Sequence, residues 1–131
     1  MTPLTWRRRV AVGLAAGLAI AYVDNVAFEG EVSPIVTVAM LLATTTTAAG
    51  ISGRRGWITA GAAWVCVPLV HLIKHVLGLP DTLHPNTYAS ILMLGVFTFA
   101  VTTLGTGAGM LIHRGVSRTS KRNPVSGRGH R

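Results

Sequence analysis

The chain alternates between long apolar runs and short polar segments. Four of the runs approach or exceed the ~20 residues that a helix needs to cross a bilayer. They cover residues 10–28, 33–51, 57–77 and 88–112. Because the connections between them are short, consecutive helices are expected to be antiparallel. The pattern therefore predicts an all-α membrane protein in which residues 1–113 form an antiparallel four-helix transmembrane bundle.

Local signals define several ends of these helices. Ser33 followed by Pro34 is typical of a helix start, with Ser at the N-cap and Pro in the first turn. Asn86 or Thr87 is expected to cap the fourth helix in the same way. Pro68 falls inside the third helix, where proline removes a backbone donor, so a kink or a carbonyl without its helical partner is expected there.

Basic residues are distributed unevenly between the two sides of this bundle. Eleven of the twelve Lys and Arg residues fall on the side of the two termini, and Lys74 falls with all four acids on the other. Basic residues beside membrane spans are retained in the cytoplasm, so both termini are predicted to be cytoplasmic. We expect a multi-pass protein of a cell membrane, of the bacterial inner-membrane type.

The net charge of +8 would suggest nucleic acid as a partner of a soluble protein, but the membrane topology explains it. Residues 114–131 contain six basic residues and no acid. They are expected to form a short, disordered, cytoplasmic tail that contacts anionic lipid headgroups.

The first apolar run also has a second interpretation. Three arginines, a short apolar core and the small residues around Ala21 resemble a cleavable signal peptide. Apolar residues continue past Ala21 to Phe28, which favours an uncleaved span. Cleavage of this segment remains an open alternative.

Small residues recur at helical spacing in the first and fourth runs. Gly13 and Gly17 share one face, and Gly105 and Gly109 share another. Helices in lipid associate by close packing, which small residues permit. These two stripes are expected either to pack inside the bundle or to form an interface with a second copy or a larger membrane-protein partner.

One cluster of polar residues is predicted near the outer surface. His71, Lys74 and His75 are three and four residues apart, so they share one face of the third helix. Asp24 lies 14 residues into the first run and His71 lies 14 residues into the third, or roughly 21 Å along each helix. We therefore expect Asp24 to face the third helix and to contact His71 or Lys74.

This cluster supports three interpretations. It can be a structural set of paired polar groups, a site for a proton or small solute, or a zinc or copper site built on His71 and His75. Leu72 follows His71 where a zinc protease has Glu, and Lys74 adds a positive charge that disfavours a cation. No cofactor or metal is therefore expected.

The main constraint on the function is that the sequence contains no catalytic or cofactor motif. The sequence has no pattern of nucleophile and base and no cofactor motif, so no enzymatic activity is expected. The leading hypothesis is a small integral membrane protein, an accessory or scaffold subunit that acts through helix packing and partners. The alternative is a small oligomeric transporter or channel for an ion, proton or small anionic solute, using Asp24, His71, Lys74 and His75.

Overall fold

A computed structural model describes residues 5–25 and 34–122. These residues form four α-helices and one short 3-10 helix, and the described part of the chain contains no strand. The elements are α1 (Trp6–Asn25), α2 (Pro34–Ser52), η2 (Gly53–Arg55), α3 (Gly56–Leu77) and α4 (Tyr88–Arg122). The chain is thus all-helical, as predicted.

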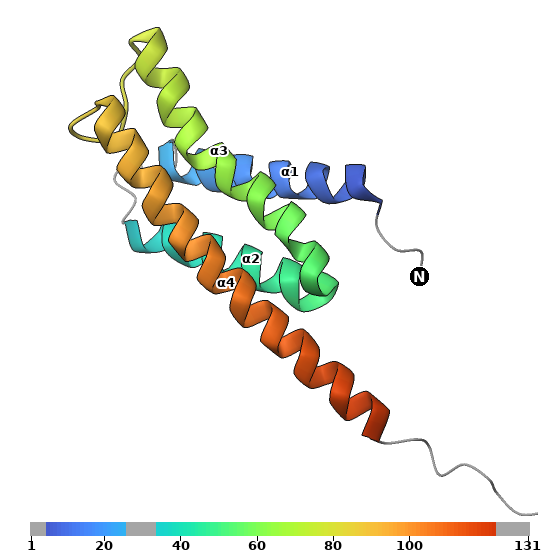
Figure 1. Cartoon of the computed structure of the whole chain (residues 1–131). Coiled ribbons are helices and arrows are strands. Elements are labelled where there is room, and N and C mark those ends of the chain that lie inside the picture. Colours follow the sequence, from blue (N-terminus) through green and yellow to red (C-terminus); the bar gives the residue numbers. More distant parts are fainter. Residues whose placement is uncertain (1–4, 26–33, 123–131) are drawn as a thin grey trace, which may run out of the picture.

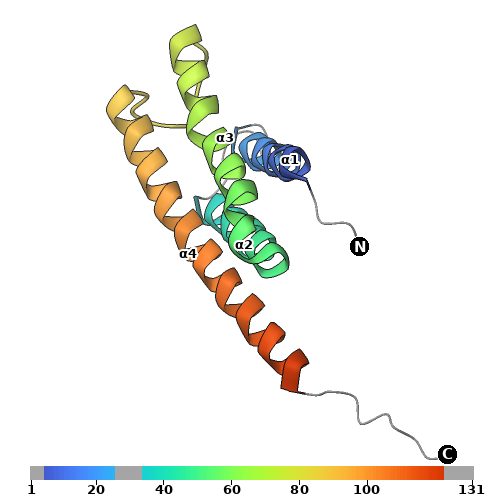
Figure 2. The same ribbon diagram turned by 45° about the vertical axis from the view of Figure 1, so that its right-hand side comes forward.

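The helices are arranged as two crossing pairs. Figure 1 shows α1 and α2 running across α3 and α4, and in Figure 2 α1 and α2 are seen nearly end-on while α3 and α4 remain extended. The closest packing joins helices that are not consecutive: α1 packs mainly on α3, and α2 packs mainly on α4. The four helices are therefore held together by contacts between the two pairs more than within them.

Glycines form both of these contacts. A Cβ atom on Gly17 would lie 2.5 Å from the Ala63 carbonyl oxygen, and one on Gly13 would clash with the Thr59 carbonyl. On the other side, a Cβ on Gly105 would clash with the Thr45 hydroxyl, and one on Gly109 would clash with the Thr46 carbonyl. The stripes therefore let α1 approach α3, and α4 approach α2, within one chain.

The interior between the helices is small and partly polar. Ile20, Leu41, Val67 and Val101 form its apolar core. Buried threonines continue the core along α2 and α4, and Thr45 and Thr106 donate their hydroxyls to carbonyls one turn earlier in their own helices. Thr46 instead donates to the Gly105 carbonyl across the α2–α4 contact, at 3.1 Å. Such bonds satisfy hydroxyls that could not be exposed to lipid at low cost.

A tight turn connects α2 to α3 and also contacts α4. Gly53 has a φ of +57°, a conformation that glycine adopts without strain. The ring of His113 packs against Gly53, and its Nδ1 donates to the Gly50 carbonyl at 2.8 Å. One end of the bundle is thus formed by this turn, by the beginning of α1 and by α4 near residue 113.

The long α4 corrects one expectation from the sequence. The helix was expected to end near residue 112 and to be followed by a disordered tail, but it continues without a break to Arg122. No Gly–Pro or Asn–Pro stop occurs before residue 122, and the first proline in this part of the chain is Pro124. Residues 123–131 lie outside the described residues.

Two other local predictions can be compared with the structure. Thr87, one of the two residues proposed as the cap of the fourth helix, accepts the Ser90 N–H with its hydroxyl at 3.2 Å. Pro68 lies inside α3, which is nevertheless one continuous helix from Gly56 to Leu77. The predicted cap Ser33 and the end of the first run at residue 28 lie outside the described residues.

The lengths and apolar composition of the helices support only part of the predicted set of four membrane spans. Two helical segments of the described chain are long and apolar enough to cross a membrane, Pro34–Leu77 and Tyr88–Ser120. The first of these contains α2, η2 and α3 together. The described residues of α1 do not qualify, because Arg7, Arg8, Arg9 and Asp24 occupy its two ends.

Candidate functional site

The predicted polar cluster lies where α1 and α3 end and α2 begins, at the end of the bundle opposite to η2. Its centre is His71, whose side chain is only 2% exposed. The ring stands between two carboxylates. Nε2 lies 3.0 Å from Oδ2 of Asp24, and Nδ1 lies 2.8 and 2.9 Å from the two carboxylate oxygens of Asp81. The predicted contact between Asp24 and the third helix is therefore present.

The positions of the two carboxylates constrain the protonation state of the His71 ring. An imidazole ring donates from both nitrogens only when it is the imidazolium cation. With both aspartates ionised, both ring nitrogens of His71 must donate, and the ring carries one positive charge. Asp24, His71 and Asp81 then have a net charge of −1, which is compatible with a fourth, positive group nearby.

Lys74 supplies that positive charge. Its Nζ lies 3.9 Å from Oδ1 of Asp81, a long ion pair, and donates to Oδ1 of Asn25 at 2.7 Å. Both interactions of Lys74 are thus with residues other than Asp24. With Lys74 included, two carboxylates face two cations, so the cluster has no net charge.

Neighbouring donors complete the coordination of the carboxylates. The Thr37 hydroxyl donates to Oδ1 of Asp24 at 2.8 Å, which connects α2 to the cluster. The backbone N–H of Thr82 donates to Oδ1 of Asp81 at 2.8 Å. The cluster thus joins α1, α2, α3 and the loop before α4, and no other described group of ionised side chains joins as many elements.

Asp81 reaches His71 because the chain reverses sharply after α3. Gly78 has a φ of +64°. Its N–H donates a hydrogen bond to the His75 carbonyl, and the N–H of Leu79 donates one to the Lys74 carbonyl. Many α-helices end in this way, with a glycine in the left-handed conformation after the last turn. It turns the loop back over the helix end and buries the Asp81 side chain completely, with 0% exposed.

His75 is the predicted member that the structure leaves outside the cluster. Its ring packs edge-on against Tyr88 at 4.4 Å between centroids, on the side facing α4. The structure therefore does not bring His71 and His75 together at one site. Among the described residues, no group of three or more His, Cys, Asp and Glu side chains is placed to hold a metal ion.

The sequence placed Asp81 only among the four acids on the same side as Lys74, and Thr37 was not included. The signal for Asp81 was available in the Gly78 that follows the last apolar residue of α3, since such a glycine reverses the chain. The signal for Thr37 was weaker. Its distance from Pro34 places it one turn into α2, at the depth of Asp24, but many threonines in this chain have no such partner.

A small hollow borders the cluster. It has a volume of about 170 Å³ and is lined by polar groups of Asp24, His71, Thr37 and Thr82 on one side. Leu94 and Phe97 of α4 line the other side. Asp24, at 19% exposed, is the member of the cluster through which this hollow reaches the ion pairs.

The chain matches no family model, no curated protein and no solved structure. Functional conclusions therefore depend on the residues and their geometry alone.

Proposed function

We propose that this chain is a four-span integral membrane protein that acts without catalysis, as an accessory or scaffold subunit that packs against a partner in the bilayer. The observation that carries the proposal is the closed polar cluster. Its four charged groups are directed at one another and at chain hydroxyl, amide and backbone groups. Charges inside a membrane protein are costly and usually serve a pathway or a structural pair. Here the pairing favours the structural role.

The outer surfaces of the helices are consistent with this proposal. Large apolar side chains are exposed on α1 and along most of α4, including Leu18, Met93 and Leu104. Such a surface is unfavourable in water but is the normal exterior of a protein in lipid. The glycine stripes are used inside the chain, so these larger side chains are what a partner would contact.

The distribution of charge supports an orientation with both termini in the cytoplasm. The beginning of α1, the η2 turn and α4 near His113 lie at one end and contain the arginines, whereas Asp24, Asp81 and Lys74 lie at the other. Cysteine introduced at Ser52 or Ser117 of a Cys66→Ala protein should be protected from an impermeant thiol reagent outside whole cells. Cysteine at Thr82 should be labelled. Labelling of Ser117→Cys from outside would refute the orientation.

Photo-crosslinking tests whether the protein has a partner in the membrane. A photoreactive amino acid at Met93 or Leu104 samples the exposed side of α4, and one at Leu18 samples α1. We expect a protein adduct of one size from one of these surfaces and lipid adducts from the other. Lipid adducts alone from all three positions would contradict the scaffold proposal.

A small transporter or channel is the second candidate, and the hollow beside Asp24 favours it. A hollow that reaches an Asp–His pair could admit water or a small ion to an exchangeable proton. Purified protein in liposomes should then dissipate a pH gradient or carry a small anion, and Asp24→Asn should abolish the flux. Gradients that decay at the same rate in empty liposomes and in protein liposomes would exclude this candidate.

A further inference from the structure

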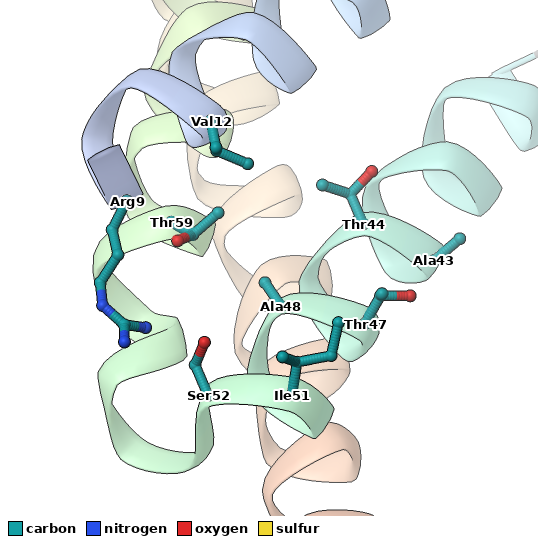
Figure 3. Close-up of a pocket in the computed structure, with 9 residues that line it drawn as sticks. All are labelled: Arg9, Val12, Ala43, Thr44, Thr47, Ala48, Ile51, Ser52 and Thr59. Carbon is teal, nitrogen blue, oxygen red and sulfur yellow. The ribbon is translucent and has the colours of Figure 1, made fainter. Parts of the chain in front are cut away.

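A second hollow lies at the opposite end of the bundle, between α1, α2 and the beginning of α3. It has a volume of about 490 Å³, within the ~300–1,000 Å³ of ordinary ligand pockets. Figure 3 shows the side chains that line it. Val12, Ala43, Ala48 and Ile51 give it apolar walls, while Thr44, Thr47, Thr59 and Ser52 contribute hydroxyl groups.

Arg9 is the charged group of this hollow. Its side chain is buried, at 8% exposed, whereas Arg7 and Arg8 beside it are exposed. In Figure 3 it extends from α1 past Thr59 toward the end of the hollow where Ser52 lies. A guanidinium has five N–H donors, so it can serve an anion in addition to partners within the chain.

The charges near this hollow are all of one sign. Within residues 5–25 and 34–122 the only acids are Asp24 and Asp81, and both belong to the polar cluster at the far end. Arg54 and Arg55 of η2, separated from Ser52 by Gly53, add to the positive charge. An anion that enters the hollow therefore gains from Arg9 and from its neighbours, and meets no carboxylate of the described chain.

We propose that this hollow binds one phospholipid with an anionic headgroup. The phosphate is held by Arg9 and by the hydroxyls at the Ser52 end, and an acyl chain follows the apolar wall formed by Val12, Ala48 and Ile51. An arginine binds phosphate with two parallel hydrogen bonds, which fixes its position as well as its charge. An amphiphile fits both halves of the hollow, whereas a free phosphate would leave the apolar half empty.

With both termini in the cytoplasm, as proposed above, this lipid would belong to the cytoplasmic leaflet, but the binding itself does not depend on that orientation. The purified protein in a neutral detergent is titrated with phosphatidylglycerol, phosphatidylcholine or inorganic phosphate. Thermal unfolding and native mass spectrometry follow binding. We expect one phosphatidylglycerol to bind and to raise the unfolding temperature, with no comparable effect of phosphatidylcholine. An equal effect of inorganic phosphate alone would overturn the lipid as the ligand.

Two neighbouring arginines provide a matched comparison. Arg9→Gln should weaken phosphatidylglycerol binding about tenfold, as expected for loss of a charge-assisted hydrogen bond. Arg8→Gln changes the net charge equally but removes an exposed group, and should bind as the unchanged protein does. Equal losses in the two variants would mean that the lipid is attracted by overall charge, and the site would be wrong.

A second variant tests the apolar half and keeps the proposal testable if Arg9→Gln does not fold. Thr44→Phe places a large side chain in the hollow without changing any charge, and should also weaken binding about tenfold. Leu104→Phe adds a similar ring on the exposed side of α4 and should have no effect. Unchanged lipid binding by Thr44→Phe would overturn the proposal. Because the cysteine labelling reports orientation independently, failure here leaves the proposed function intact.

Discussion

The two ends of this helical assembly use charge in opposite ways. At one end, Asp24, His71, Asp81 and Lys74 balance one another within hydrogen-bonding or ion-pair distance. At the other end, Arg9 is buried beside exposed arginines, and the described chain places no carboxylate among them. The first end is balanced by charges that the structure describes, whereas at the second we propose that an anionic lipid contributes negative charge.

In the membrane protein proposed above, this difference separates two roles of ionised groups. A balanced cluster stabilises the fold, because each charge would be costly if its partner were removed. An unbalanced one sets the orientation of the chain and attracts anionic lipid. The two ends should therefore respond differently to mutation: the balanced end should lose stability, and the basic end should change its dependence on lipid.

The largest expected effect is at the centre of the balanced end. His71→Ala leaves Asp24 and Asp81 facing each other without the cation between them, which should cost about 3–5 kcal/mol. Unfolding in mixed micelles with increasing dodecyl sulfate, followed by circular dichroism, measures this. His75→Ala, four residues away, removes only a ring packed on Tyr88 and serves as the control. Equal losses from both changes would show that the cluster is not a stabilising unit.

The same cluster shows how far the sequence determines the site. Depth along two helices placed Asp24 opposite His71, because helical rise is regular and both helices begin at the same side. The spacing of three and four residues did not separate His71 from His75. Which of two residues on one helical face points at a neighbour depends on where that neighbour packs, and this is set by the glycine contacts between helices.

The fold itself was predictable in its elements but less so in its pairing. Apolar runs identify the helices, and α2 and α3 begin and end within one residue of the expected positions. The expected end of the first helix at residue 28 lies outside the described residues, and α4 continues past its expected end to Arg122. No single apolar run indicates that α1 packs on α3 or that α2 packs on α4. Val101 lies four residues before Gly105, on the same face of α4, and it is buried in the core.

The second prediction concerns the contact that brings Asp24 to His71. Gly17→Leu should push α1 away from α3, since a Cβ there would already lie 2.5 Å from the Ala63 carbonyl and 2.9 Å from the Cys66 Cβ. We expect a loss of about 3 kcal/mol, at the upper end for overpacked interiors, and a lower folded yield. Gly107→Leu is the matched control on α4, because nothing lies within 4 Å of its Cβ position. A loss in Gly107→Leu as large as that in Gly17→Leu would contradict close packing as the cause.

The third prediction ranks the two aspartates. Asp81→Asn should cost about 2 kcal/mol and Asp24→Asn about 1 kcal/mol, because the Asp81 side chain is fully buried and also forms the ion pair with Lys74. Lys74→Met should recover part of the loss in the Asp81→Asn protein, since the ammonium then lacks its nearest carboxylate. It should recover less in the Asp24→Asn protein. Denaturation in mixed micelles of the two double variants measures this difference, and the reverse order would mean that Lys74 is paired with Asp24 instead.

The smallest expected effect comes from giving the basic end a carboxylate of its own. Thr59 lies in the first turns of α3 and lines the hollow beside Arg9, and an acid near a helix N-terminus is favourable. Thr59→Asp should therefore be more stable than Thr59→Asn, which has the same size without charge, by about 0.5–1 kcal/mol in neutral detergent. The carboxylate should also occupy the position of the lipid phosphate, so phosphatidylglycerol should raise the unfolding temperature of Thr59→Asn but not of Thr59→Asp. If phosphatidylglycerol stabilises both variants equally, Arg9 is not the group that holds the anion, and the contrast between the two ends would have to be explained by orientation alone.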